Sequence, residues 1–197
     1  NVLYLNSGAA RFQEAAHLAG LASSDWSWSP RIEDFDQDGR ADLFITNGSM
    51  RDSMNSDVSA FAESQFRPGS PEYIKFWVEQ PLHKEDNLAF RNLGDLKFQS
   101  IGALRGLQHH GVSFGAVSAD FDGDGDPDLA VSNIDKPVSL YRNRGTEHHR
   151  IAVKLVGKAS NQDGLGATIR LLTSAGMQSR AITSARGWLS ASETTAL

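Results

Sequence analysis

Two stretches of the chain gather aspartates at a spacing suited to cation binding. Asp34 to Asp42 and Asp120 to Asp128 both read Asp-x-Asp-x-Asp-Gly-x-x-Asp. Calcium takes about six to eight oxygen ligands in a flexible geometry. The pattern supplies carboxylates from positions 1, 3, 5 and 9 and a backbone carbonyl from position 7, and glycine at position 6 permits a sharp bend. The sequence therefore predicts two calcium sites, held by Asp34, Asp36, Asp38, Asp42 and the Arg40 carbonyl, and by Asp120, Asp122, Asp124, Asp128 and the Asp126 carbonyl.

The two loops differ from the EF-hand, which needs a bidentate glutamate at position 12 and a helix on each side. Position 12 here is Ile45 or Val131, within an expected strand. A structural rather than a switching role for calcium follows. Magnesium is less suitable because it demands tight octahedral geometry and keeps its water. Zinc favours histidine or cysteine.

The charge of the chain agrees with cation sites. Its formal net charge is -5, and the eight matched aspartates of the two loops are a third of its 24 acidic residues. Two bound divalent cations would bring the balance to -5 + 4 = -1. The sequence shows no strongly basic face, so we expect no nucleic-acid partner.

The elements that must position these loops belong to a repeat. At a constant offset of 86 residues, the loop aspartates coincide, and so do positions in the segments around them. A third copy of the opening pattern begins at Leu140. The matched residues outside the loops are Asn1, Tyr4, Asn6, Gly8, Phe12 and Trp28 with Asn87, Phe90, Asn92, Gly94, Phe98 and Phe114.

Short strands dominate the repeated part. Strands are predicted directly after the loops, over 42–47 and 128–133, and around Tyr4, Phe90 and Tyr141, each of the latter closed by an Asn-x-Gly turn. Units of roughly 50 residues with short strands are typical of propeller blades. The fold class we expect is all-β, a partial β-propeller over residues 1–145. Because a blade buries its faces against its neighbours, we expect further blades from the same longer chain or from another chain.

A helical insertion is predicted at about 49–86, where the first unit is longer than the second. Ser70 and Pro71 form a helix start, and Pro81 ends the segment. Ile74, Trp77 and Val78 share one helical face. We expect this insertion to cap an edge or end of the sheet structure.

The remainder, residues 146–197, is predicted to be a small, separate β domain that is incomplete. Its expected strands lie at 150–156, 167–172 and 178–183. The chain as a whole has 40% apolar and 22% charged residues, as an ordinary globular protein does. It has no cysteine, and no apolar run is long enough to span a membrane.

The motifs resemble a known family. Phe114-Gly115-Ala116-Val117 followed by Asp120 to Asp128 is similar to the FG-GAP repeat, also called the VCBS repeat, of integrin-type β-propellers. Trp28 to Asp42 resembles a diverged copy without the Phe-Gly pair. Residues 161–190 resemble an ASPIC/UnbV domain, and the whole arrangement is similar to the family of cartilage acidic protein and its bacterial relatives.

The resemblance implies a seven-bladed propeller with calcium in the blade loops, in a secreted, periplasmic or cell-surface protein. It implies adhesion or interaction with a protein or glycan, and no catalysis. The alternative is a polysaccharide-acting lyase or hydrolase on a propeller scaffold, because fold alone does not decide function. An exposed apolar or aromatic patch, for example on the 49–86 insertion, would favour the binding module.

Histidines and tryptophans are weaker candidates for metal binding and for partner contacts. The adjacent pairs His109-His110 and His148-His149 invite a metal interpretation, but neighbours on a strand point to opposite faces. Trp28 occupies a repeat position and is expected to pack in the core. Trp77 lies on the insertion and is the better candidate for a partner contact.

Overall fold

Two four-stranded sheets organise the chain in this computed structural model, which describes residues 1–146, 148–174 and 176–196. Sheet I has the strand order β3-β4-β6-β7, and sheet II has the order β11-β10-β9-β14. The strands of sheet I are β3 (Pro30–Glu33), β4 (Asp42–Ile45), β6 (Leu88–Asn92) and β7 (Phe98–Ser100). Those of sheet II are β9 (Ser113–Ala119), β10 (Asp128–Asn133), β11 (Ser139–Tyr141) and β14 (Ala191–Ser192).

The 86-residue repeat is visible in the strands. β1 (Tyr4–Asn6) and β2 (Phe12–Glu14) form an antiparallel hairpin whose positions match β6 and β7. The predicted Asn-x-Gly turns are confirmed in all three copies, because the backbone N–H of Gly8, Gly94 and Gly145 donates to the side-chain oxygen of the asparagine two residues before it, at 2.9, 2.9 and 3.1 Å. Glycine suits this place because all three adopt a positive φ.

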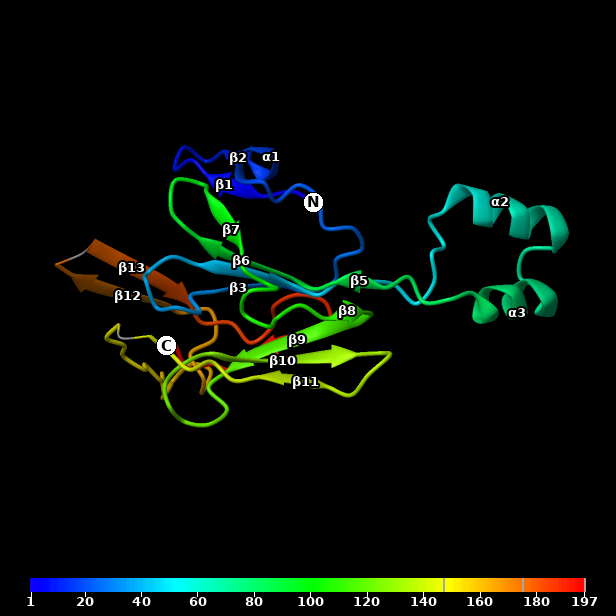
Figure 1. The fold of residues 1–197 in the computed structure, drawn as a ribbon. Helices are drawn as coiled ribbons and strands as arrows, with labels where there is room; N and C mark the ends of the chain where they lie inside the picture. Colours follow the sequence, from blue (N-terminus) through cyan, green and yellow to red (C-terminus); the bar gives the residue numbers. More distant parts are fainter. Residues whose placement is uncertain (147, 175, 197) are drawn as a thin grey trace.

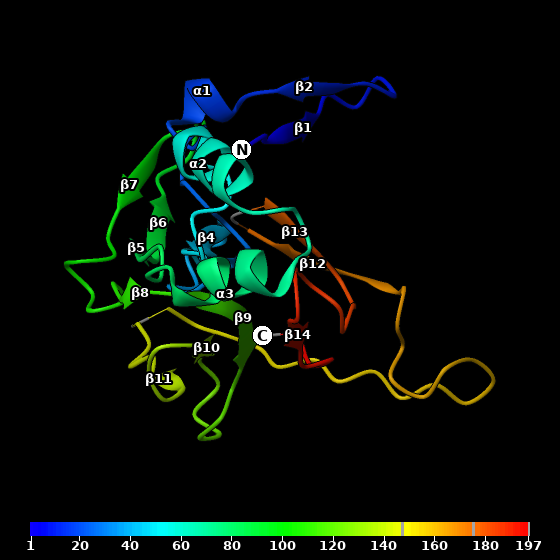
Figure 2. The ribbon, with the colours of Figure 1, turned by 90° about the vertical axis from the view of Figure 1, so that its right-hand side faces the viewer.

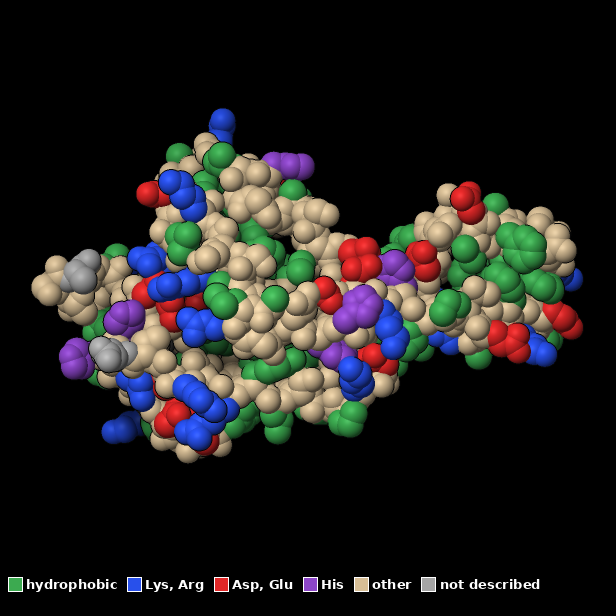
Figure 3. All heavy atoms as spheres, viewed as in Figure 1, with side chains coloured by type: hydrophobic (Ala, Val, Ile, Leu, Met, Phe, Trp, Pro, Cys, Tyr) green, Lys and Arg blue, Asp and Glu red, His purple; other side chains and the backbone are tan. Residues whose placement is uncertain are grey.

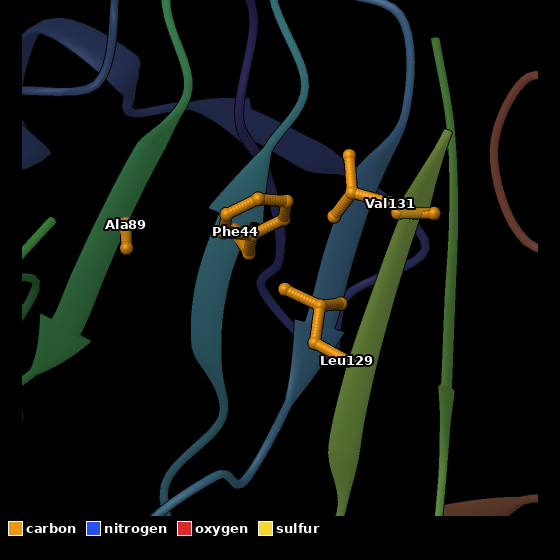
Figure 4. Packing of buried hydrophobic residues seen from close by; sticks show 5 residues of the cluster. Phe44, Ala89, Leu129 and Val131 are labelled. Atoms are coloured by element: carbon orange, nitrogen blue, oxygen red, sulfur yellow. The ribbon is translucent and has the colours of Figure 1, made fainter. Parts of the chain in front are cut away.

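The core lies between the two sheets. Phe44 of β4 and Ala89 of β6 face Leu129 and Val131 of β10, and Ala116 of β9 completes the cluster (Figure 4). These side chains alternate along their strands with residues that point away, as the period of two requires. Burying a phenylalanine, leucine or valine side chain fully contributes roughly 1.5–3 kcal/mol. The two sheets are therefore held to each other by a small apolar layer.

The remaining elements surround these sheets. The short helix α1 (Ala16–Ala19) follows the β1–β2 hairpin, β5 (Glu85–Asp86) pairs with β8 (His110–Gly111), and β12 (Thr168–Thr173) pairs with β13 (Gly176–Ala181). Figure 1 shows the β1–β2 hairpin above sheet I and the β12–β13 hairpin extending to the side opposite the helices. Figure 2, turned by 90°, shows the 150–166 segment looping out beyond the sheets.

The insertion is helical, as predicted. Asn55 caps α2 (Ser56–Gln65), and Ser70 caps α3 (Pro71–Glu79) through its side-chain oxygen, which accepts from the backbone N–H of Tyr73. The two helices pack through Phe76, whose ring lies 5.9 Å from that of Phe61 and 5.7 Å from that of Phe66. Figure 1 shows the pair projecting away from the sheets, so it does not cap an edge as we expected. Helix packing inside the insertion replaces packing against the sheets.

The C-terminal segment joins sheet II along its inner edge. β14 runs parallel to β9, with Ala191 opposite Val117. Gly115 permits this approach, because a Cβ there would lie 2.4 Å from the Leu189 carbonyl oxygen. The expected strand at 150–156 is not formed; Val153 makes a single bridge to Ala196. The boundary predicted between 145 and 146 stays a prediction.

A buried arginine ties both sheets to this segment. Arg31 of β3 has no exposed surface, and its guanidinium donates to the Ser118 hydroxyl at 2.7 Å, to the Arg186 carbonyl at 3.1 Å and to the Ser192 hydroxyl. Burial lowers the pKa of Arg31, against the favourable charge of Glu33. An interior ionic group of this kind requires its partners, so the last residues form part of the inter-sheet packing.

The fold is thus mostly β with few helices, as an all-β repeat protein requires. No closed propeller is formed by the described residues. The helices within the described ranges are all too short or too polar to cross a membrane.

Candidate metal centre

The first aspartate loop, residues 34–42 and here called loop I, connects β3 to β4. Its first and last carboxylates hold the turn. Asp34 accepts from the backbone N–H groups of Asp38 at 3.1 Å and Gly39 at 2.8 Å. Asp42 accepts from the N–H of Phe35 at 3.3 Å and, on its other oxygen, from that of Asn92 in β6 at 2.8 Å. Asp42 thereby joins the loop to the neighbouring strand.

The second loop, residues 120–128 and here called loop II, connects β9 to β10 with the same contacts. Asp120 accepts from the N–H groups of Gly123, Asp124 and Gly125 at 2.7, 3.1 and 2.8 Å. Asp128 accepts from the N–H of Phe121 at 3.0 Å and from that of Asn143 at 2.7 Å. The glycine at position 6 has a φ of 87° in both loops, which confirms the predicted bend.

Three of the four predicted carboxylates converge in each loop. Each of these residues offers one oxygen, and the three oxygens lie within 4.8 Å of one another. The clusters comprise positions 1, 3 and 9, which are Asp34, Asp36 and Asp42 in loop I and Asp120, Asp122 and Asp128 in loop II. The structure therefore brings together six of the eight aspartates that the sequence selected.

The aspartates at position 5 turn instead to arginines. Asp38 forms an ion pair with Arg40 and lies 3.4 Å from Arg91, and Asp124 lies 3.2 Å from Arg142. Arg91, in β6, and Arg142, directly after β11, also reach position 3, since Arg91 lies 2.6 Å from Asp36 and Arg142 lies 2.5 Å from Asp122.

The arginines at 91 and 142 are functional neighbours that the sequence analysis missed. Both precede the asparagine of an Asn-x-Gly turn, in Phe90-Arg91-Asn92 and Tyr141-Arg142-Asn143. This shared repeat position is the signal that could have identified them. Each guanidinium supplies the positive charge that a bound cation would otherwise provide.

Position 7 was expected to contribute only its backbone carbonyl. Within the described residues neither that of Arg40 nor that of Asp126 accepts a hydrogen bond. The Arg40 side chain donates to the Asn92 carbonyl at 3.1 Å. The Asp126 side chain is buried and lies 2.8 Å from Arg150. Carbonyl ligation by these two residues stays a prediction.

Loop I carries an electrostatic cost when its carboxylates are charged. Burial raises the pKa of Asp42 to about 6; the hydrogen bond from Asn92 opposes this shift, and the charges of Asp36 and Asp34 add to it. Burial also raises the pKa of Asp34, with smaller contributions of the same sign from Asp38 and Asp36. Clustered carboxylates in a partly desolvated place disfavour their own ionisation. A divalent cation would remove this penalty.

The donor set fits a hard cation. Asp36 Oδ1 is buried and has no hydrogen-bond partner within the described part of the chain. An orphaned carboxylate oxygen beside two further carboxylates is the type of ligand that Ca²⁺ takes. To bind the ion, Asp36 and Asp122 would have to give up part of their ion pairs with Arg91 and Arg142.

Neither adjacent histidine pair belongs to a metal-ligand cluster among the residues that the structure describes. His109 is buried against Asp135, with 3.3 Å between Nε2 and Oδ1, and the exposed His110 lies 3.0 Å from Asp86. His148 lies 3.0 Å from the Asp36 carbonyl oxygen, beside loop I. Trp28 packs edge-on against Phe114 with ring centres 4.8 Å apart, in agreement with its expected packing role.

Comparison with known proteins agrees with the repeat. Residues 1–45 and 120–169 match the family model described as the FG-GAP-like repeat, and the matched segments contain both aspartate loops. These matches support an FG-GAP repeat protein. No curated protein gives a significant match to the chain.

Proposed function

We propose that this chain is a calcium-binding β-propeller module of a secreted, periplasmic or cell-surface protein, which mediates interaction with a protein or glycan. Calcium has a structural role in it. The observation that carries the proposal is the pair of three-carboxylate clusters at the same position of two sheets. The match to the FG-GAP-like repeat supports an adhesion or interaction module.

The ion would act through the connections that each loop already makes. Asp42 accepts from the backbone N–H of Asn92 in β6, and Asp128 accepts from that of Asn143, which follows β11, so each links its loop to the neighbouring strand or the turn after it. A cation held by positions 1, 3 and 9 would neutralise the repulsion between these carboxylates and fix the loop relative to that strand. Its contribution is therefore to the stability of each sheet.

Exposed aromatic residues on the β1–β2 hairpin support further propeller blades. The side chains of Tyr4 and Phe12 on the β1–β2 hairpin are 60% and 65% exposed, whereas the matching Phe90 and Phe98 in sheet I are partly buried. Further blades, from the same longer chain or another chain, would cover this hairpin as sheet II covers sheet I. An ASPIC/UnbV-like domain at 146–197 belongs to the same proposal.

The binding role is supported by the helix pair. Phe61 on α2 and Ile74 and Val78 on α3 are all more than half exposed. Figure 3 shows apolar side chains spread over this projecting part. An exposed apolar surface on the insertion favours a protein-binding module over an enzyme that acts on polysaccharide.

Calcium binding is tested by elemental analysis and thermal unfolding of the whole chain. We expect two calcium ions per chain after dialysis against calcium, none after a chelator, and a melting temperature that rises with calcium concentration. At a hundred times the dissociation constant, each site should stabilise the fold by about 2.7 kcal/mol. Magnesium at the same concentration should have a smaller effect.

Paired variants assign the ions to the loops. Asp34→Asn with Asp36→Asn should leave one ion, Asp120→Asn with Asp122→Asn should leave the other, and all four substitutions should leave none. An unchanged melting temperature together with no calcium in the wild-type chain would overturn the proposal.

A further inference from the structure

A histidine lies at the neck where the helix pair leaves the sheets. His83 follows α3 and forms an antiparallel bridge with Ser49, which precedes α2, through N–H to carbonyl distances of 2.8 and 3.0 Å. Figure 3 shows acidic and histidine side chains gathered at this narrow part of the molecule. The bridge fixes the backbone that carries the imidazole.

Three carboxylates from different segments surround the His83 ring. Asp25, in the segment before β3, lies 3.4 Å from Nε2, and Glu85, in β5, lies 3.6 Å from the same nitrogen. Asp52, at the start of the insertion, lies 3.8 Å from Nδ1. His83 and Glu85 are two residues apart along an extended segment, so their side chains share one face.

The distances also suit metal coordination. His83 lies at ion-pair distance from Asp25 and Glu85, and one donor atom from each of the three residues lies within 4.8 Å of the other two. Zinc ligands lie at about 2.0–2.2 Å, so two corners of a zinc tetrahedron are about 3.3–3.6 Å apart. The two measured separations fall within this range.

No ion pair joins these three carboxylates to a lysine or an arginine in the described part of the chain; His83 is the partner of each. The neighbouring bases are engaged elsewhere: Lys84 pairs with Asp135 at 3.3 Å, and Arg51 donates to the carbonyls of Trp77 and Val78. The aspartates of loops I and II differ in this respect, because arginines accompany them. One imidazole and three carboxylates therefore leave an excess of negative charge.

We propose that Asp25, His83 Nε2 and Glu85 form a binding site for Zn²⁺, with Asp52, 3.8 Å from Nδ1, as the carboxylate that would close on Nδ1–H and orient the imidazole once the ion is bound. One nitrogen and two oxygens suit zinc, whereas calcium calls for a larger set of oxygens. Three protein ligands leave a fourth position for water, which can enter because the Asp25 side chain is 47% exposed. The ion would join the segment before β3 to the exit of the helix pair and so fix its orientation.

The site is tested by zinc titration of the chelator-treated whole chain, with calcium held at saturation so that the loops do not compete. Isothermal titration calorimetry should give one zinc ion per chain. His83→Gln should abolish this binding, and Asp25→Asn and Glu85→Gln should each weaken it at least about tenfold. Asp52→Asn should weaken it about 10–100-fold, as loss of an orienting carboxylate does. His110→Gln, which alters an exposed histidine outside the cluster, is the matched control and should bind as the wild type does.

Two further readouts keep the test independent of folding and of the calcium sites. Cobalt in place of zinc should give the intense visible absorption of four-coordinate Co²⁺ in the wild type but not in His83→Gln, and zinc should slow tryptic cleavage at Arg51. The calcium-dependent melting of His83→Gln should match that of the wild type, which shows that the variant folds. Absence of stoichiometric zinc binding, or equal binding by His83→Gln, would overturn the zinc site and leave the calcium proposal untouched.

Discussion

Loops I and II share nine positions and most of their backbone hydrogen bonds, yet they lie in different surroundings. In loop I the Asp38 side chain is 7% exposed and Arg91 is 37% exposed, whereas in loop II Asp124 is 29% and Arg142 67% exposed. Phe35 packs against the core between the sheets, but its counterpart Phe121 is 54% exposed. The comparison teaches that the same motif can be covered at different positions: positions 2 to 4 are partly buried in loop I and exposed in loop II, whereas positions 7 and 8 are exposed in loop I and buried in loop II.

The clustered carboxylates differ in electrostatics. Burial raises the pKa of Asp42 and Asp34, which belong to the loop I cluster. In loop II, burial raises the pKa of Asp126, which lies outside the cluster, and the hydrogen bond from the Asp126 N–H lowers the pKa of Asp124, with a further contribution from Arg142. Charge is thus less tolerable in loop I, so a cation should matter more to it.

The largest loss of stability is expected at position 9, where the two loops make matching hydrogen bonds. Asp42→Ala and Asp128→Ala each remove the acceptor of two backbone N–H groups. An unsatisfied buried donor costs about 1–3 kcal/mol, so each variant should lose about 2–4 kcal/mol in chemical denaturation. A large difference between the two variants would contradict the equivalence of position 9 in the two loops.

Truncation of the phenylalanine at position 2 should give the clearest difference in stability loss between the two loops. Phe35→Ala opens a gap in the layer between the sheets and should cost about 2–3 kcal/mol, less than a fully buried phenylalanine because Phe35 is only partly buried. Phe121→Ala should remain within about 0.5 kcal/mol of the wild type. Equal losses in urea unfolding would show that both loops are anchored alike.

The pH dependence of stability in the calcium-free protein should also distinguish the two loops. The folded pKa of Asp42 is raised from 3.8 to about 6, so ionisation opposes folding, and stability is lost as the pH rises through this interval. The shift corresponds to at most about 3 kcal/mol, and solvent screening should reduce it to about 1–2 kcal/mol. The Asp42 contribution should therefore give the calcium-free wild type a higher melting temperature at pH 5 than at pH 7.

Two controls accompany the pH experiment. Asp42→Asn should lose that part of the pH dependence. Saturating calcium should reverse the trend, because the ion favours the carboxylate form. A pH profile identical in wild type and Asp42→Asn would contradict the assignment of the shift to loop I.

Small losses of stability are expected from substitution of Arg91 and Arg142. Arg91→Gln leaves Asp36 and Asp38 without this partner and should cost about 0.5–1 kcal/mol without calcium. Its calcium affinity should rise, since the side chain competes with the ion for position 3. Arg142→Gln, on the more exposed loop, should change calcium-free stability less. Calcium calorimetry and thermal melts of both variants measure these differences. A larger loss of calcium-free stability for Arg142→Gln than for Arg91→Gln would contradict the expected difference between the loops.

Local features were predictable from the sequence. The repeat offset, the strands after each loop, the Asn-x-Gly turns and the α3 start at Ser70-Pro71 depend on residues close together in the chain, where glycine, proline and capping side chains act directly on the backbone. The aspartate spacing likewise brought positions 1, 3 and 9 together, because nine residues confine them to one turn.

Long-range features were not predictable in this way. The expected strand at 150–156 did not form although its residues alternate, and the helix pair projects instead of covering a sheet. Both outcomes depend on which surfaces are available for packing. The cluster around His83 was missed because Asp25, Asp52 and Glu85 come from separate segments.

The sequence by itself determined the aspartate loops, their repetition and the β-rich character of the chain, since each is encoded by residue type at short spacing. Only the tertiary structure decided which positions of each loop are buried, that Arg91 and Arg142 face the position 3 and 5 carboxylates, and that β14 enters sheet II beside Gly115. The physical reason is that burial and charge pairing are properties of neighbours in space. Matching motifs therefore acquire different electrostatics when different positions of each loop are buried.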